Sequence, residues 1–285
     1  MRQEAYFCTV KELNELGKDK IPQQLISHTH LIYSSPATLA FNSPGAEGFG
    51  VKRAGLAVPD SIMLIVSPGC CGRNTSVLSS MRAYHDRFYY LLMDETDIVT
   101  GRHLKKIPKA VAEICEELEK KPSVVMICIT CVDALLGTDM ERVCHKAEEY
   151  AGIPVRPCYM YALTREGRKP PMVHVRQSIY SLLEPKKKKG NVVNLLGYFS
   201  PLVDDCELYD LLHGAGVKTI HEISRCRDYA EYQTMSEANL NLVLHPEARF
   251  AAEDFHDRLK IPYIELCRLY QIDKIASQYL SLIHI

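Results

Sequence analysis

The chain has 285 residues, of which 47% are hydrophobic and 24% charged, and its formal net charge is −1 at neutral pH. This length suits two domains of ordinary size or one large domain, and the apolar fraction is sufficient for buried cores. A net charge near zero gives no electrostatic reason to expect a nucleic-acid partner. No apolar run approaches the roughly 18 residues of a membrane span, and the N-terminus lacks the apolar core of a signal peptide. We therefore predict a cytoplasmic protein with no membrane partner.

The cysteine content is the unusual feature of the composition, with eleven in the chain. An odd number without an export signal argues against a disulfide framework and favours buried thiols or metal ligands. Cys128 and Cys131 form a CxxC pair, but they lie on a predicted strand and at its end, so their side chains are not expected to converge as in a zinc knuckle. The cysteines in helix or strand patterns without convergent spacing are predicted to be structural: Cys115, Cys128, Cys144, Cys158, Cys206, Cys226 and Cys267.

The N-terminal part of the chain reads as alternating helices and strands. Helices are predicted over residues 10–17, 75–90, 107–120, 133–150 and 171–183, and strands over 124–130, 153–159 and a run that begins at residue 62 and ends in a Pro68-Gly69 turn. Residues 35–50 are rich in Gly, Pro and Ser but too apolar for a linker, so we expect an ordered loop over a site.

Two of the predicted strands end next to thiols. The continuous apolar run from residue 62 is typical of a buried parallel strand, and it is followed by Cys70 and Cys71. The strand over residues 124–130 is followed by Cys131. Ligands of open α/β sheets bind outside the carboxyl ends of the strands, so these thiols are predicted to share one site.

The lysine run at residues 186–189, followed by Gly190, marks a boundary that we interpret as a solvated hinge, with docking of an acidic partner as a minor alternative. Beyond it, strands over 192–198, 217–220, 240–244 and 262–266 alternate with helices over 206–212, 229–238 and 247–259. Such alternation is typical of parallel sheets. We predict an α/β fold of two stacked, Rossmann-like parallel-sheet domains, residues 1–185 and 190–279.

The end of the sequence does not complete this pattern. Residues 271–279 begin a further helix, whereas residues 280–285 complete no element. We interpret them as a non-native tail on a fragment that lacks a third, C-terminal domain, and no functional prediction uses His284.

Three motifs resemble the component 1 subunits of nitrogenase and nitrogenase-like oxidoreductases: Ser67-Pro-Gly-Cys-Cys-Gly72, the segment 94–101 and the segment 131–139. The segments 192–197, 238–243 and 261–264 fit the same family, and the similarity covers residues from about 30 to 275. The resemblance implies an iron–sulfur cluster at the interface of two component 1 subunits, identical or paralogous. It also implies an ATP-dependent iron–sulfur reductase as electron donor and a small-molecule substrate in a cleft between domains. Since this chain has no GxxxxGK[ST] motif, ATP would be handled by that partner.

On the family pattern, Cys71 and Cys131 match cluster-ligating cysteines. The family's first cluster cysteine would fall near residues 43–45, where this chain has none. That departure counts against an eight-iron cluster and favours two thiolates from each of two subunits, which would hold one 4Fe–4S cluster. Cys70 could restore a third ligand if the turn directs neighbouring side chains to the same side. The alternative for these thiols is that they are small buried hydrophobes.

His245 directly follows the predicted strand 240–244, at the carboxyl edge of the second sheet. The resemblance places it within one residue of the cysteine that holds the active-site metal cofactor in the catalytic subunit of nitrogenase. A histidine there could ligate a metal or protonate a substrate, and the alternative is a histidine that caps the next helix. Weaker candidates are Arg102, His103 and Arg249, while Asp97 is predicted to fix the loop before Gly101.

The resemblance therefore implies an oxidoreductase subunit with His245 as proton donor. The missing cofactor cysteine argues against a molybdenum–iron cofactor held in the nitrogenase manner. A second hypothesis is a scaffold on which a metal cluster is assembled and handed on, which would share the fold and the interface cluster. A third is an α/β binding module with incidental cysteines.

Overall fold

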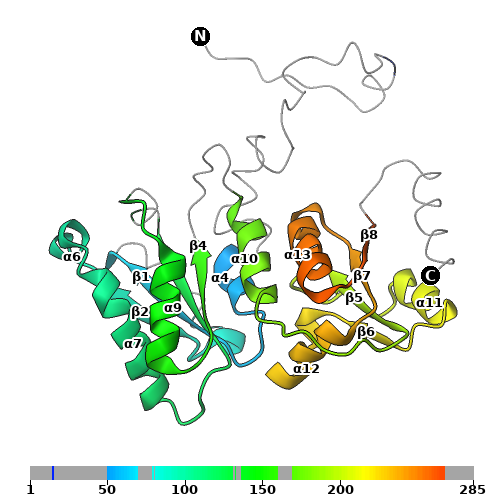
Figure 1. Cartoon of the computed structure of the whole chain (residues 1–285), viewed down its shortest axis with the longest axis horizontal. Helices are drawn as coiled ribbons and strands as arrows, with labels where there is room; N and C mark the ends of the chain where they lie inside the picture. The colour runs from blue at the N-terminus through cyan, green and yellow to red at the C-terminus, as the bar shows by residue number, and fades with distance from the viewer. Residues whose placement is uncertain are drawn as a thin grey trace.

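The computed structural model describes residues 50–69, 81–130, 136–159 and 169–266, together with residues 15, 79 and 132. These residues form two parallel four-stranded sheets with helices around them, as shown in Figure 1. The predicted α/β class is thereby confirmed. The predicted helix 271–279 lies outside the described residues, as do almost all of the helix 10–17 and of the loop 35–50. The domain boundaries stay predictions.

The first sheet has the strand order β2-β1-β3-β4. Its central strands β1 (Ile62–Ser67) and β3 (Val125–Ile129) are the two apolar runs of the sequence, and both are fully buried. Alternate residues of β1 serve two cores: Leu64 packs towards α7 (His103–Glu117) and α9 (Met140–Ala151), whereas Met63 packs towards α4 (Gly50–Gly55) and α10 (Pro171–Tyr180). Helices on both faces explain why the run is continuously apolar.

The predicted helix over residues 75–90 is wrong at its C-terminal end. The described part contains a short 3-10 helix, η4 (Arg82–Tyr84), and the strand β2 (Phe88–Leu92), which pairs in parallel with β1. Between them Asp86 has φ 59°, a left-handed conformation that an α-helix does not contain. The aromatic run Phe-Tyr-Tyr at the start of β2 is a strand signal that outweighs the helical spacing. The other edge strand is β4 (Val155–Tyr159).

The second sheet has the order β6-β5-β7-β8 and confirms the predicted alternation. Its strands are β5 (Val192–Leu196), β6 (Thr219–His221), β7 (Leu240–Val243) and β8 (Tyr263–Glu265). Its α-helices are α11 (Glu207–Gly214), α12 (Tyr229–Gln233) and α13 (Arg249–Leu259), with 3-10 turns η5 (Ile223–Arg225), η6 (Thr234–Glu237) and η7 (Pro246–Ala248). The predicted helices 229–238 and 247–259 are each a 3-10 turn joined to an α-helix. In the described part of the chain, no helix is both long and apolar enough to cross a bilayer.

Helix α10 joins the two sheets. It packs on α4 and β4 of the first half and on α13 of the second, and one apolar cluster runs through both halves. Within that cluster the ring of Tyr180 meets the ring of Phe255 edge-on, with centroids 5.2 Å apart. Because the halves share a core, the chain segment between them is not a free hinge. Lys186 and Lys187 are exposed as predicted, whereas Lys188 donates to the Ser236 carbonyl at 2.6 Å.

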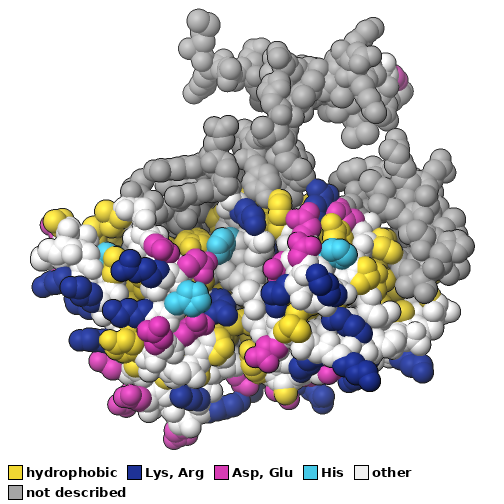
Figure 2. All heavy atoms as spheres, in the orientation of Figure 1, with side chains coloured by type: hydrophobic (Ala, Val, Ile, Leu, Met, Phe, Trp, Pro, Cys, Tyr) yellow, Lys and Arg dark blue, Asp and Glu magenta, His cyan; other side chains and the backbone are white. Residues whose placement is uncertain are grey.

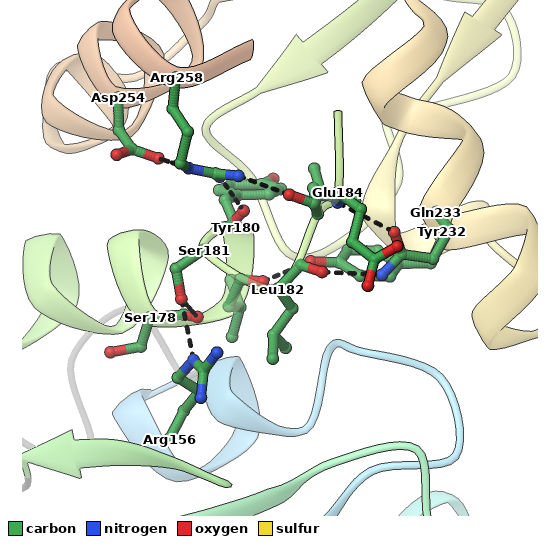
Figure 3. A network of polar contacts seen from close by, with 12 residues as sticks. Arg156, Ser178, Tyr180, Ser181, Leu182, Glu184, Tyr232, Gln233, Asp254 and Arg258 are labelled. Atoms are coloured by element: carbon green, nitrogen blue, oxygen red, sulfur yellow. Dashed lines mark hydrogen bonds and ion pairs between the residues drawn. The ribbon is translucent and has the colours of Figure 1, made fainter. Parts of the chain in front are cut away.

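The C-terminal end of α10 is capped by side chains of the second half, as Figure 3 shows. The last carbonyls of a helix have no partner within it. Here the Tyr232 hydroxyl donates to the carbonyl of Ile179, and Arg258 donates to that of Tyr180 at 2.9 Å. Just past the helix, Gln233 donates to the carbonyl of Leu182 at 2.9 Å. The junction is therefore fixed by directional bonds as well as by apolar contact.

Removing one of these caps should weaken the junction. We expect Tyr232→Phe to lower the free energy of unfolding by about 1–2 kcal/mol, because the carbonyl of Ile179 loses the hydroxyl donor and keeps only backbone donors such as the Leu182 N–H at 3.4 Å. Urea denaturation measures this change. The control is Tyr150→Phe, which removes the same hydroxyl from an exposed ring and should change stability by less than about 0.5 kcal/mol. Equal effects of the two variants would contradict the capping role.

Candidate functional site

The sequence predicts a thiol site at the carboxyl edge of the first sheet. Strands β1 and β3 are neighbours in register, with Val66 opposite Ile129. The segments that follow these strands therefore leave the sheet at the same edge. Cys70, Cys71 and Cys131 lie outside the described residues, so their ligand role stays a prediction. Of the cysteines predicted to be structural, Cys115, Cys128, Cys144 and Cys158 are buried, Cys206 and Cys226 are half-buried, and Cys267 lies outside the described residues.

Two buried hydroxyls mark this edge. Ser67 ends β1 and Thr130 directly follows β3, and neither hydroxyl oxygen has a hydrogen-bond partner among the described residues. Leaving such a group unsatisfied costs about 1–3 kcal/mol, so a polar partner is expected there. Hydrogen bonds to cluster or thiolate sulfur are a regular feature of iron–sulfur sites. The described part of the edge thus fits a cluster held by the cysteines that follow.

The segment 94–101 builds a short helix beside this edge. The Asp94 carboxylate accepts from the Asp97 backbone N–H at 2.6 Å to begin α6 (Glu95–Thr100), and Gly101 ends it with φ 66°. The buried Asp97 carboxylate accepts from Lys106 at 2.7 Å and from Arg102 at 3.2 Å. The hydrogen bond from Lys106, more than the charge of Arg102, lowers the pKa of Asp97. Asp97 therefore holds this loop, as predicted.

The weaker candidates have structural contacts. His103 is buried, with Nδ1 3.0 Å from the carbonyl oxygen of Asp97. Arg249 makes a two-pronged ion pair with Glu265 at 2.6 and 2.7 Å. Within the described ranges, no three His, Cys, Asp or Glu side chains gather at a spacing suited to a metal ion.

His245 lies at the carboxyl edge of the second sheet, two residues after β7. Its Nδ1 accepts from the Glu247 backbone N–H at 3.3 Å, which caps η7. The ring meets that of Tyr198 edge-on at 5.8 Å, and 23% of the side chain is exposed. The histidine is thus a helix cap, and its side chain also reaches solvent at the place where α/β sheets bind ligands.

Gly197 allows the chain to pass close to His245. It follows β5 with φ 144°, and a Cβ placed on it would lie 2.8 Å from the His245 backbone nitrogen. That distance is shorter than any ordinary carbon–nitrogen contact, so a side chain here requires the backbone to move. The two residues that precede Gly197 and His245 are also bonded to each other. The Leu244 N–H donates to the Leu196 carbonyl at 2.7 Å.

The sequence did not predict the role of Arg176, which comes from α10 of the first half. Its guanidinium is buried and donates to the Gly197 carbonyl through Nε (3.2 Å) and Nη2 (2.6 Å). Nη1 donates to the Met172 carbonyl and to the Glu247 carboxylate, each at 2.8 Å. The sequence around it, Pro-Met-Val-His-Val-Arg-Gln-Ser-Ile-Tyr, mixes polar and apolar residues and does not single out this arginine. Through Glu247 this residue reaches the segment that carries His245.

A groove of about 380 Å³ lies between α9, β4, α10 and α13. Its lining includes Glu141, His145, Arg156, His174, Ser178 and Asp254. In His174, Nδ1 lies 3.2 Å from the Ser178 hydroxyl, and Tyr159 meets the ring edge-on at 4.3 Å. Burial lowers the pKa of His174 to about 4, and the nearby charge of Lys169 acts in the same direction. The groove therefore contains a neutral imidazole at pH 7. In Figure 2, acidic, basic and histidine side chains are interspersed on the face shown.

Comparison with known proteins gives one family. The family model described as nitrogenase component 1 type oxidoreductase matches residues 47–284. The nitrogenase iron-molybdenum cofactor biosynthesis protein NifE of Nostoc sp. (strain PCC 7120 / SAG 25.82 / UTEX 2576) is 26% identical over 216 residues, which are 73% of this chain and 44% of that protein. NifE of Klebsiella pneumoniae is 25% identical over 244 residues, and the match covers 78% of this chain and 53% of that protein. The chain spans about half the length of the curated relatives it matches.

Solved structures agree on the fold. Nitrogenase Cp1 at pH 6.5 superposes with a TM-score of 0.61 and 17% identity, covering 82% of this chain and 56% of that one. Nitrogenase Cp1 at pH 5 superposes with a TM-score of 0.55 and 20% identity, covering 82% of this chain and 53% of that one. At these identities the likeness concerns the fold alone.

The contact at Gly197 can be tested directly. We expect Gly197→Ala to destabilise the protein by about 1–3 kcal/mol, because the added methyl group meets the His245 backbone and φ is positive. Gly190→Ala is the matched control, since a Cβ there has no neighbour within 4 Å. Thermal unfolding of both variants measures the difference. A Gly197→Ala variant as stable as the wild type would show that the two segments are not in contact.

The burial of His174 predicts a stability loss in acid. Above pH 6.5 the ring is neutral both folded and unfolded, so it contributes no pH dependence. Between pH 6.5 and about 4 only the unfolded chain takes up the proton, and stability falls with pH by up to about 3 kcal/mol.

Denaturant titrations at pH 8, 6 and 4.5 should therefore give a shallower pH slope for His174→Gln than for the wild type. His256→Gln, on an exposed part of α13, is the control and should keep the wild-type slope. An unchanged slope for His174→Gln would mean that the ring is not buried in the neutral form.

Proposed function

Because the chain belongs to the nitrogenase component 1 type oxidoreductases, we propose that it binds an iron–sulfur cluster through Cys71 and Cys131. The observation that carries the proposal is the pairing of β1 with β3, together with the orphaned hydroxyls of Ser67 and Thr130 at their ends. Two thiolates from this chain and two from a second component 1 subunit, identical or paralogous, complete the ligands of a 4Fe–4S cluster. Cys70 adds a third if its turn permits. Such a cluster supplies one-electron transfer.

The role that we propose for this cluster site is metal-cluster assembly. The relatives reported above are named as cofactor biosynthesis proteins, which supports a scaffold over a terminal reductase. A scaffold holds a metal–sulfur cargo at the sheet edges and then releases it to an acceptor. The proposed location is the cytoplasm, where thiols stay reduced.

A second candidate is a reductase, and the placement of His245 favours it. A partly exposed imidazole at the carboxyl edge of a parallel sheet can deliver a proton to a substrate in the cleft. In this case an ATP-dependent iron–sulfur reductase supplies the electrons, and a small molecule is the substrate.

Anaerobic turnover separates the two candidates. The purified chain and its partner subunit are mixed with a low-potential iron–sulfur reductase and ATP. A scaffold loses iron and sulfide to an apo-acceptor protein without consuming a metabolite, whereas a reductase retains its iron and consumes the substrate. A colourless, iron-free protein after anaerobic purification would reject both candidates and leave a binding module.

The ligand assignment predicts the effect of single substitutions. Cys71→Ser and Cys131→Ser should each remove at least half of the bound iron, because every copy of this chain in the complex loses one cluster thiolate. Iron and sulfide analysis with the visible absorption spectrum measures this loss. Cys206→Ser is the control, since that half-buried thiol precedes α11 in the second half and serine is a good residue at a helix start. Full iron content in the Cys71 and Cys131 variants would refute the site.

A further inference from the structure

A second cavity, of about 330 Å³, lies where α7 and α9 begin. The two helices pack against each other in the first half of the chain (Figure 1). The lining of the cavity includes Lys105 of α7, together with Arg142 and Lys146 from successive turns of α9. Small molecules bind in cavities of roughly 300–1,000 Å³, so this one is large enough for a small ligand.

The three cationic side chains of this cavity are not used within the fold. None of them forms an ion pair or a side-chain hydrogen bond with another residue of the described ranges. The neighbouring cations at the start of α7 differ, because Arg102 and Lys106 both bind the carboxylate of Asp97, at 3.2 and 2.7 Å. The positive charge around the cavity is therefore available to a ligand.

The cavity has an excess of positive charge. Of its described lining residues, only Asp139 carries a carboxylate, and this group accepts from the Arg142 backbone N–H at 3.1 Å as the N-cap of α9. Arg142 and Lys146 are four residues apart on one helix, a spacing at which like charges repel and disfavour the helix. An anion bound between them would remove this repulsion and accept charge-assisted hydrogen bonds.

The cavity also has apolar walls. Leu104 of α7 and Val143 of α9 line it, and both are half-buried. Sites for small molecules typically combine such a lining with a few charged groups that orient the ligand. A guanidinium can bind an oxyanion through two parallel hydrogen bonds, and a lysine ammonium acts as a point charge. The combination suits a small organic molecule that carries two or more negative charges.

We propose that this cavity is a binding site for a small organic oxyanion, either a phosphate ester or a di- or tricarboxylate. Lys105, Arg142 and Lys146 hold its charged groups, and Leu104 and Val143 contact its carbon skeleton. The proposed cluster ligands and His245 are not among the lining residues. The site therefore goes beyond the proposed function and does not depend on it.

Isothermal titration calorimetry of the whole chain tests the site with two probes that share a benzene ring, phenyl phosphate and isophthalate. At least one of them should bind with one-site saturation, and added sodium chloride should weaken the binding because salt screens exposed charges. Benzoate has the same ring and a single charge, and it should bind at least about tenfold more weakly. Saturation by phenyl phosphate alone identifies a phosphate ester as the ligand class, and saturation by isophthalate alone identifies a polycarboxylate.

Substitutions locate the binding in the cavity. Lys105→Gln and Arg142→Gln should each weaken the binding of the probe by about tenfold, because each removes a charge-assisted hydrogen bond. Lys109→Gln is the matched control, since Lys109 is also exposed on α7, one turn further along, but does not line the cavity. It should change the affinity by less than about threefold, because salt screens a charge that does not contact the ligand. Circular dichroism verifies that each variant is folded.

The proposal is overturned if neither probe gives saturable binding to the folded wild type. Binding of benzoate as tightly as the doubly charged probes would also overturn it, as would equal effects of Lys109→Gln and of the two cavity variants. Iron content does not enter this test, so the anion site and the cluster site can fail independently.

Discussion

The arrangement of both sheet edges depends on the bonds that the buried guanidinium of Arg176 makes. It belongs to the first half of the chain, yet its partners are the Gly197 carbonyl and the Glu247 carboxylate of the second half. Each of these groups is costly to leave unpaired once it is removed from water. The junction therefore has one relative position in which this charge is satisfied, and the apolar cluster around α10 fills the space in that same position.

Helix α10 also relates the two candidate edges to each other. His174, near the start of the helix, contacts Tyr159 at the end of β4, on the carboxyl edge of the first sheet. Arg176, two residues further on, binds Gly197 at the carboxyl edge of the second. Because one turn of a single helix contacts both edges, a shift of either sheet is transmitted to the other through a short rigid path. A cargo or substrate that contacts both sheet edges would find them already held at a fixed distance from each other.

The sequence predicted the elements whose apolar residues form a periodic or continuous pattern. It did not predict contacts between residues that lie far apart in the chain. The buried runs at residues 62–66 and 125–129 identified the central strands, because helices cover both faces of the first sheet. The edge strand β2 was predicted as the end of a helix, since the break at Asp86 is a single residue and depends on its backbone conformation. The role of Arg176 could not be predicted, because its partners in the second half, Gly197 and Glu247, lie 21 and 71 residues away. Cys70, Cys71 and Cys131 were predicted from a family resemblance, and their placement lies outside the described residues.

The side chain of His245 differs from a metal-holding cysteine in how it can hold a ligand. A cysteine thiolate at a sheet edge bonds directly to a metal, and such bonds make large contributions to binding. An imidazole that donates from an N–H group makes a hydrogen bond, whose net contribution is about 1 kcal/mol. An edge that grips its cargo through donors holds it weakly and can exchange it, as an assembly scaffold requires. The same donor, facing a bound substrate with a basic atom, is a proton source. Both proposed functions therefore stay chemically open for His245, which offers no thiolate for a direct sulfur–metal bond.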